Sequence, residues 1–207
     1  MKIAIVSDTH GEIADLVLAL RAFKPDRFIH LGDYESDAKA IARETKLPYD
    51  AVGGNCDGSR EKGKLLTIDG KKIFLTHGHL FGVKMNLTRL YYHALEMGAD
   101  VVFFGHTHRP FLEKTGGILF CNPGSASRPV FGEGTFALWE DGEISFFACE
   151  KSLTRTRTIA ILFKRWITWF ITCGCSSVVE HRLPKPCARV RFPSPAPVSA
   201  WWAWPSW

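Results

Sequence analysis

Histidine and acidic side chains recur in this sequence directly after short apolar stretches. The segment FFGHTH places His106 and His108 two positions apart, after the apolar run at residues 101–104. Polar residues that could bind a metal follow apolar runs at five places: Asp8 and His10, Asp33, Asn55, His77 and His79, and His106 and His108. Imidazole nitrogen combined with carboxylate and amide oxygen suits a divalent ion such as Mn²⁺, Fe²⁺ or Zn²⁺.

These side chains are too many for one ion. A carboxylate can bridge two ions about 3.5–4 Å apart, which is the arrangement of two-metal hydrolases. Glycines accompany the candidates at positions 32, 54, 78 and 105. Glycine lets the backbone pass close to a metal without a Cβ clash. The residue types therefore indicate a two-metal hydrolytic centre.

Alternating strand and helix patterns position the first candidates. The first half predicts strands at residues 2–7, 28–31 and 51–52 and helices at residues 12–23 and 36–45. Ser36 or Asp37 is expected near the N-cap of the second helix. This order predicts a parallel sheet with crossover helices. Ligands gather at the carboxyl ends of such strands, so the five polar clusters are expected to converge.

The second half is richer in hairpins. Asp69-Gly70, between strands predicted at 64–68 and 71–76, is a strong two-residue hairpin signal. The other elements predicted are a helix at 86–97 and strands at 101–104, 111–113, 118–121, 135–139 and 143–148. The fold class predicted is α/β, a two-sheet β-sandwich of mixed strands flanked by helices, with an irregular C-terminal tail.

Charge and composition divide the chain in two. Residues 1–150 carry 17 basic and 20 acidic side chains, whereas residues 151–207 carry nine basic and one acidic, with six of the seven tryptophans. We predict one domain at 1–150 and an anomalous basic tail, rich in Trp and Pro, at 151–207, disordered or loosely attached. The tail resembles frameshifted or read-through sequence.

Cysteine usage and the N-terminus bear on localisation. Cys56, Cys121 and Cys149 are scattered singly, which is typical of reduced thiols in a cytoplasmic protein. The apolar run at the N-terminus ends at Asp8 and is too short for a signal peptide or a membrane span. No transmembrane segment and no specific nucleic-acid partner are predicted.

The motifs, taken in order, resemble a known superfamily. They are DTH at 8–10, LGD at 31–33, GGNCD at 53–57, THGH at 76–79 and GHTH at 105–108. This ordered set looks like the calcineurin-like metallophosphoesterase superfamily, and most closely its small single-domain bacterial and archaeal phosphodiesterase branch. NPGS at 122–125 is also similar to that branch. The resemblance covers about residues 1–148 and implies the four-layer metallophosphoesterase fold.

The resemblance also implies roles for individual residues. Asp8, His10 and His108 would hold one ion, Asn55, His77 and His106 a second, and Asp33 would bridge them. The candidate catalytic residues are Asn55, His10 and His79, and Cys56, Asn122 and Ser125 are expected behind the ligands or in a substrate loop. The cofactors expected are two divalent ions, Mn²⁺ first, with Ni²⁺, Fe²⁺ or Zn²⁺ as alternatives. In extended backbone, residues i and i+2 share a face, so His106 and His108 would reach neighbouring ions while Thr107 points away.

The implied reaction is metal-dependent phosphodiester hydrolysis of a small substrate, with a metal-bridging hydroxide attacking phosphorus in line. Asn55 would help to bind the phosphoryl oxygens. Many superfamily members have a histidine at the position of Cys56 that protonates the leaving group. A thiol substitutes poorly, and losing a general acid costs ~10²–10⁴-fold. His79 or Asp57 could compensate.

Several alternatives stay open. The same site would serve a phosphomonoesterase or nucleotide pyrophosphohydrolase, and some relatives of this fold are non-catalytic interaction scaffolds, although no ligand is missing here. Oligomeric state is open, a homodimer included. His30 and His93 are interpreted as structural, and Asp57 as a turn residue. GSREKGK at 58–64 resembles a phosphate-binding loop, but a strand follows it, so an exposed loop is predicted. A zinc site of Cys173, Cys175, Cys187 and His181 is not favoured.

Overall fold

The structure, a computed structural model, describes residues 1–149. The tail predicted at 151–207, together with the cysteine and histidine residues weighed there as a zinc site, lies outside the described residues. Among the helices of residues 1–149, none has the length and apolarity needed to cross a membrane.

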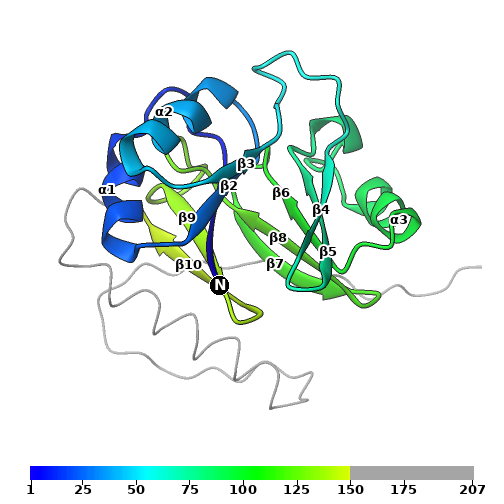
Figure 1. Cartoon of the computed structure of the whole chain (residues 1–207). Helices are drawn as coiled ribbons and strands as arrows, with labels where there is room; N and C mark the ends of the chain where they lie inside the picture. Colours follow the sequence, from blue (N-terminus) through cyan, green and yellow to red (C-terminus); the bar gives the residue numbers. More distant parts are fainter. Residues whose placement is uncertain (150–207) are drawn as a thin grey trace, which may run out of the picture. The chain divides into compact units, whose positions relative to one another are not determined.

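The first sheet is the predicted parallel sheet, extended by an antiparallel hairpin (Figure 1). Its strand order is β10-β9-β1-β2-β3, with β1, β2 and β3 parallel. The strands are β1 (Lys2–Val6), β2 (Arg27–His30), β3 (Tyr49–Ala51), β9 (Thr135–Glu140) and β10 (Glu143–Ala148). The crossover helices are α1 (Ala14–Phe23) and α2 (Glu35–Thr45).

The second sheet contains the predicted hairpin and the strand that precedes the paired histidines. Its order is β4-β5-β6-β8-β7, and β5, β6 and β8 are parallel. The strands are β4 (Lys64–Ile68), β5 (Lys71–Thr76), β6 (Val101–Phe104), β7 (Pro110–Thr115) and β8 (Ile118–Pro123). A 3-10 turn, η1 (His79–Phe81), and helix α3 (Thr88–Glu96) join β5 to β6. Asp69 and Gly70 both have positive φ, as the predicted hairpin turn requires.

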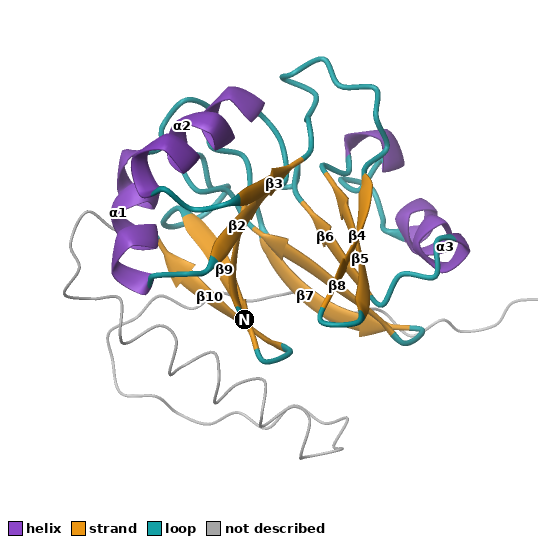
Figure 2. Cartoon of the chain, in the orientation of Figure 1, coloured by secondary structure: helices purple, strands orange, loops and turns teal. Residues whose placement is uncertain are grey.

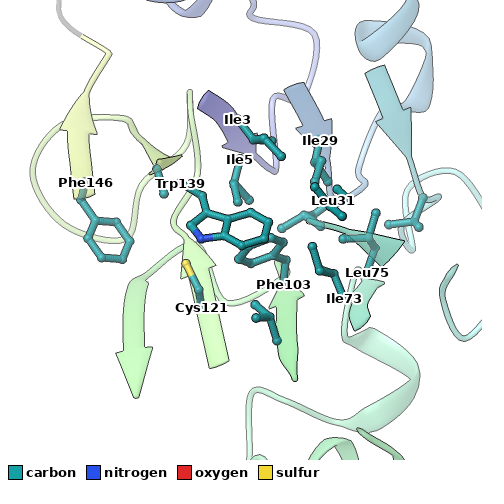
Figure 3. Close-up of a cluster of buried hydrophobic side chains, with 14 residues drawn as sticks. Ile3, Ile5, Ile29, Leu31, Ile73, Leu75, Phe103, Cys121, Trp139 and Phe146 are labelled. Atoms are coloured by element: carbon teal, nitrogen blue, oxygen red, sulfur yellow. The ribbon is translucent and has the colours of Figure 1, made fainter. Parts of the chain in front are cut away.

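Alternation along the strands builds four layers. Ile3 and Ile5 face the second sheet, where they join a buried cluster with Phe103 and Trp139 (Figure 3). The intervening Ala4 belongs to the cluster beneath α1 and α2. A third cluster lies between the second sheet and α3: its members include Phe74, Leu90, Ala94, Val102 and Phe104. The predicted sandwich of two mixed sheets flanked by helices is confirmed.

Two details at helix starts differ from the prediction. The α2 helix begins at Glu35 rather than at Ser36, and Tyr34 is its N-cap in a left-handed conformation, so that Ser36 and Asp37 lie near the N-cap as predicted. The α3 helix begins at Thr88 rather than at Asn86. The Asn86 side chain instead accepts a hydrogen bond from the Thr88 backbone N–H at 3.0 Å.

The parallel strands of both sheets direct their following loops to one end of the molecule. In Figure 2 the long loop between β3 and β4 passes from the first sheet to the second at this end. The polar residues that follow β1, β2, β3, β5 and β6 therefore lie close together, as the strand order predicted.

Candidate metal centre

Four side chains form a first group of possible metal ligands. One ligand atom each from Asp8, His10, Asp33 and His108 lies within 4.8 Å of the others. Nε2 of His10 is 3.3 Å from Nε2 of His108 and 3.8 Å from Oδ2 of Asp33. The first sheet supplies Asp8, His10 and Asp33, whereas the second supplies His108.

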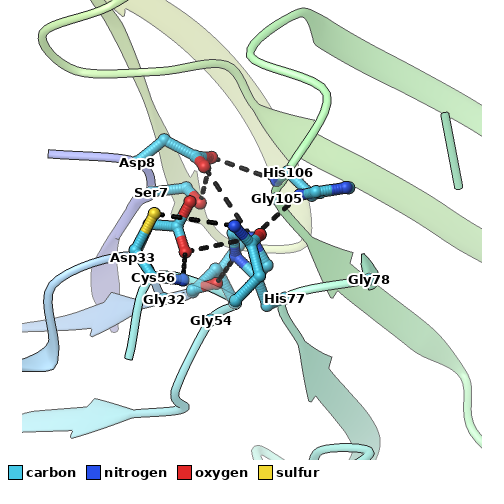
Figure 4. A network of polar contacts seen from close by, with 12 residues as sticks. Ser7, Asp8, Gly32, Asp33, Gly54, Cys56, His77, Gly78, Gly105 and His106 are labelled. Carbon is cyan, nitrogen blue, oxygen red and sulfur yellow. Dashed lines mark hydrogen bonds and ion pairs between the residues drawn. The ribbon is translucent and has the colours of Figure 1, made fainter. Parts of the chain in front are cut away.

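A second group shares Asp33 with the first. It contains Asp33, His77 and His106, again within 4.8 Å. Nε2 of His77 lies 3.5 Å from Oδ1 of Asp33 and 3.2 Å from Nδ1 of His106. Oδ1 of Asn55 is 3.0 Å from the same Nε2 atom. All seven side chains named from the sequence as metal ligands thus lie in one cluster, and Figure 4 shows its Asp8, Asp33, His77 and His106 side by side.

Two of the histidines are held with a lone pair directed into the cluster. Nδ1 of His77 lies 2.8 Å from the Leu31 carbonyl, and Nδ1 of His108 lies 2.6 Å from the Arg128 carbonyl. A carbonyl oxygen only accepts hydrogen bonds, so both Nδ1 atoms carry the proton. In the neutral rings, the Nε2 atoms are then left as acceptors that face the carboxylates. Backbone hydrogen bonds of this kind fix the orientation of metal-ligating histidines.

The cluster has more acceptors than donors, which fits a cation. Oδ1 of Asp8 is buried and has no hydrogen-bond partner, although Nε2 of His108 lies 3.2 Å away. A buried acceptor without a partner destabilises a fold by about 1–3 kcal/mol. Divalent ions coordinated by this carboxylate and the neighbouring imidazole lone pairs would remove that cost. The donor set of imidazole, carboxylate and amide oxygen therefore fits borderline divalent metals.

The protonation states also suit ligands. Burial lowers the pKa of His10, against the opposing influence of Asp8 and Asp33. Burial likewise lowers the pKa of His106 to about 4, with help from His77. Although burial raises it, the neighbouring His108, His77 and Ser7 hold the pKa of Asp8 below its usual value. At neutral pH the cluster thus offers the Asp8 carboxylate and the neutral imidazoles of His10 and His106, the forms that bind metals. The contact with Asp8 instead raises the pKa of His108.

The backbone at the ligands is left-handed, contrary to the extended conformation predicted for His106 and His108. Positive φ values occur at Asp8 (56°), His10 (45°), Asp33 (56°), His106 (68°) and His108 (56°). The prediction was wrong because the chain turns at once after β6: the Thr107 N–H bonds to the Gly105 carbonyl and the His106 N–H to Oδ2 of Asp8. Such conformations cost of order 1–3 kcal/mol each and cluster at functional sites.

Close approach at the centre requires glycine at several positions, of which Gly54 and Gly105 are the tightest. A Cβ at Gly54 would overlap Oδ1 of Asp33, and one at Gly105 would overlap the Ser7 hydroxyl. The Ser7 hydroxyl itself donates to Oδ2 of Asp8 at 2.6 Å. Glycine is therefore required beside the candidate ligands by neighbouring side chains, and the predicted approach of the backbone to a metal stays a prediction.

Asn122 and Ser125 lie behind the ligands rather than in a substrate loop. Both are fully buried. The Asn122 amide donates to the Gly105 carbonyl at 2.8 Å and to the Thr107 hydroxyl at 3.0 Å. The Ser125 hydroxyl donates to the Asp8 carbonyl at 2.7 Å. These bonds fix the loops that carry Asp8, His106 and His108.

The other candidate catalytic residues differ in accessibility. Asn55 and Cys56 are exposed beside the cluster, and burial together with Asp33 raises the pKa of the Cys56 thiol. His79 is less available, because its Nε2 lies 3.1 Å from the Ser59 carbonyl and its Nδ1 is buried without a partner. Proton donation by His79 would require the ring to leave Ser59.

The sequence interpretation missed a supporting network under the His10 loop. Oδ2 of Asp37 accepts hydrogen bonds from the Thr9 hydroxyl and the Gly11 N–H, both at 2.7 Å. Nε2 of His30 lies 3.0 Å from the same hydroxyl, which agrees with the structural role predicted for His30. The available signal in the sequence was an acidic residue, Asp37, in the first turn of the helix that follows β2. An acidic residue at this position is equally typical of a helix N-terminus, so the signal did not indicate a contact with the His10 loop.

The remaining interpretations of single residues can be placed. Asp57 holds its own loop and the start of α2, because its carboxylate accepts from the Gly54 and Glu35 N–H groups. His93 packs against the rings of Phe74 and Phe81, as a structural residue would. Residues 58–64 lead directly into β4, so the phosphate-binding loop is excluded as predicted.

Comparisons with known proteins agree with this site. Residues 1–141 match the calcineurin-like phosphoesterase superfamily domain. The probable metallophosphoesterase YsnB of Bacillus subtilis is 42% identical over 133 residues, which cover 62% of this chain and 77% of the relative. The phosphodiesterase YfcE of Escherichia coli is 31% identical over 159 residues, covering 64% of this chain and 83% of the relative. A crystal structure of a phosphoesterase-like protein from Streptococcus pneumoniae aligns with a TM-score of 0.59 at 28% identity, over 72% of this chain and 89% of that one.

Proposed function

Because the chain belongs to the calcineurin-like phosphoesterase superfamily, we propose that it is a phosphodiesterase with two divalent metal ions at the strand-end cluster. Family membership and the ligand residues already indicate a metal-dependent phosphoesterase. The observation that carries the binuclear proposal is the sharing of Asp33 between two groups of ligand atoms. A carboxylate that faces two such groups is the expected bridge of a two-metal centre.

Two bound divalent ions would supply Lewis acidity and lower the pKa of a coordinated water to about 7. The chain's own residues prepare the site for this chemistry. His77 and His108 hold their Nε2 lone pairs in place through Leu31 and Arg128. Asn55 is exposed, and its amide can donate to a phosphoryl oxygen that faces His77. Asp33 and Asp8 balance the charge of the ions.

A phosphodiester with a good leaving group is the preferred substrate. The two nitrogens of His79 are occupied or buried, and the Cys56 thiol is a poor acid. Leaving groups that depart as stable anions need no proton, so aryl esters are expected to react faster than alkyl esters. The name of the relative YfcE, a phosphodiesterase, supports a diester rather than a monoester.

We expect Mn²⁺ as the native metal, with Ni²⁺, Fe²⁺ or Zn²⁺ as alternatives, because the donors combine imidazole with oxygen. A cytoplasmic location agrees with the three cysteines of residues 1–149, all of which are free thiols.

The proposal is tested by metal content and by hydrolysis of bis-p-nitrophenyl phosphate with added Mn²⁺. We expect about two ions per chain, and a rate at least about 100-fold above that of His77→Ala, because losing even a residue that supports a ligand costs 10–100-fold. His93→Gln is the matched control, since this histidine lies on α3 outside the cluster.

Three other results would redirect the assignment. A wild-type rate no higher than that of His77→Ala would favour a non-catalytic scaffold. Faster hydrolysis of p-nitrophenyl phosphate than of the diester would favour a phosphomonoesterase. Faster cleavage of a nucleoside diphosphate ester would favour a pyrophosphohydrolase.

A further inference from the structure

A cavity of about 620 Å³ adjoins the metal centre. His106, Thr107 and His108 form the wall nearest the ligands. The rest of the lining comes from Phe104 at the end of β6, from the segment that precedes α3, from Arg109 with the beginning of β7, and from the loop that contains Val130. The volume is within the range of small-molecule sites. Because the cavity begins at two candidate ligands, a molecule whose phosphorus lies at the metals can extend into it.

One part of the lining is apolar. Val83, Leu87, Phe111 and Val130 contribute to it, from segments far apart in the sequence. Val130 is 43% exposed although it is β-branched and apolar, and it borders the opening. Apolar surface that remains accessible inside a cavity gains from contact with an apolar group of a ligand. This wall therefore favours a ring or another apolar body over a water-filled space.

The charge of the lining is one-sided. Lys84 and Arg109 line the cavity, and none of its lining residues is acidic. The guanidinium of Arg109 lies 5.4 Å from the centre of the Phe131 ring, a cation–π contact that positions it beside the opening. Lys84 is close enough to lower the pKa of His106, after the larger effects of burial and His77. Two basic side chains without an acidic one are notable in this cavity, because residues 1–150 carry more acidic than basic side chains.

We propose that this cavity binds one ester arm of the substrate, and that it selects an arm with an aromatic or apolar body and a second negative charge. The apolar wall contacts the body of the arm, and Lys84 and Arg109 bind the charge. This inference rests on the proposed function, because the phosphoryl group must lie at the metal centre for its arm to reach the cavity. It narrows the substrate class to phosphodiesters with an anionic, ring-containing substituent.

Phosphonates with a single arm provide the test, because no second ester group can compete for the cavity. The probes are methylphosphonate, phenylphosphonate and 3-carboxyphenylphosphonate, each titrated by calorimetry into the Mn²⁺-loaded full chain. We expect phenylphosphonate to bind at least about 10-fold more tightly than methylphosphonate, because a ring contacts the apolar wall. The carboxylate of 3-carboxyphenylphosphonate is expected to increase the affinity about 5-fold further, as for an accessible ion pair.

Variants show which residues are responsible for the gains in affinity from the ring and from the carboxylate. Lys84→Met and Arg109→Met are expected to reduce the gain from the carboxylate, and Val130→Ser the gain from the ring. Lys114→Met is the matched control, because Lys114 is exposed on β7 but does not line the cavity. Exposed residues were chosen so that folding is retained, which thermal unfolding checks.

The outcomes separate this inference from the proposed function. Equal affinity for the methyl and phenyl probes would overturn the inference alone, as would a gain from the carboxylate that survives both Lys84→Met and Arg109→Met. Failure of all three probes to bind in the presence of Mn²⁺ would overturn both, because methylphosphonate needs only the metal centre.

Discussion

His30 illustrates how a single buried side chain can make this fold sensitive to acid. The Gly32 N–H donates to its Nδ1 at 3.2 Å, and its Nε2 lies 3.0 Å from the Thr9 hydroxyl. Nδ1 is therefore an acceptor in the folded state, and the ring cannot take a second proton there without losing that bond. Burial lowers the pKa of His30 from 6.5 to about 4.

The pH dependence of stability follows from this shift. The unfolded chain binds a proton at His30 below pH 6.5, whereas the folded chain does so only near pH 4. The contribution of His30 to the free energy of unfolding is therefore fully present above pH 6.5. It is lost as the pH falls from 6.5 to about 4, by about 3 kcal/mol in total. In His30→Gln this part of the loss is expected to disappear. Urea unfolding at pH 7, 6 and 5 in the presence of a chelator measures the difference.

The comparison with wild type isolates His30, because the other histidines titrate in both proteins. The variant is expected to be less stable at pH 7, since one buried hydrogen bond is lost, but to decline less steeply with acid. Parallel stability curves for the two proteins would contradict the assignment.

Gly54→Ala tests the close packing at Asp33, the carboxylate proposed to bridge the two ions. The new Cβ would overlap Oδ1 of Asp33, so the carboxylate must move out of both groups of ligand atoms. We expect at least about 100-fold weaker Mn²⁺ binding, comparable to the loss of a supporting group. Calorimetric titration with Mn²⁺ measures it.

Gly58→Ala, in the same loop, is the control. A Cβ there meets nothing within 4 Å, and the positive φ of 66° costs only about 1–2 kcal/mol of stability. Similar metal affinities for the two variants would argue against a steric role of Gly54.

At the level of elements, the loops after the strands decide the geometry of the site. The loop between β6 and β7 carries His106 and His108. The Asn122 side chain, at the end of β8, holds this loop in place by donating two hydrogen bonds to it. The Ser125 hydroxyl fixes the Asp8 loop in the same way. The site is therefore positioned in part by hydrogen bonds from β8 and the residues directly after it, which contribute no candidate ligand.

Asn122→Ala is expected to loosen the β6–β7 loop. It removes three hydrogen bonds and leaves the buried Gly124 N–H without the Asn122 oxygen that accepts from it, which costs about 2–3 kcal/mol of stability. Metal affinity is expected to fall by about 10–100-fold, the usual effect of losing a supporting contact. Denaturant unfolding and Mn²⁺ titration measure both quantities.

Asn86→Ala provides the comparison for this variant. Asn86 also accepts a backbone hydrogen bond, but at the start of α3 and on the surface. It should lose some stability and keep its metal affinity. Equal metal affinity in Asn122→Ala and wild type would mean that the loop needs no support from β8.

The elements themselves were largely predictable, whereas the loop backbone was not. Apolar runs of four to six residues and the hairpin turn at Asp69-Gly70 follow from local patterns, so the strands were placed within a few residues. The left-handed conformations of Asp8 and His106 are imposed by contacts across the two sheets, which no local pattern encodes. The role of Asp37 was missed for the same reason, because its partner Thr9 is 28 residues away. The cavity near Lys84 carries no motif at all.

Taken as a whole, the described chain contains every element that the site needs. Both sheets, the three helices and the three buried clusters lie within residues 1–149. The seven candidate ligands lie between residues 8 and 108. The domain boundary near residue 150, which charge and composition indicate, stays a prediction.

A chain that ends at Cys149 is accordingly expected to fold and to bind Mn²⁺ as the full chain does. Its midpoint of thermal unfolding should lie within a few degrees of the full-length value, since a change of 1 kcal/mol shifts a domain of this size by about 2–4 °C. Scanning calorimetry with and without Mn²⁺ measures this. Loss of cooperative unfolding in the shorter chain would place part of the folding unit beyond residue 149.

The candidate ligands come from both halves of the sandwich. Asp8, His10 and Asp33 follow strands of one sheet, and His77, His106 and His108 follow strands of the other. Ions held between them would crosslink the sheets, so cation binding and sheet docking become thermodynamically linked. At a free concentration 100-fold above its dissociation constant, each ion would add about 2.7 kcal/mol to the stability of the folded state. The availability of trace metal in the surroundings would then set how long the protein survives, as well as how fast it works.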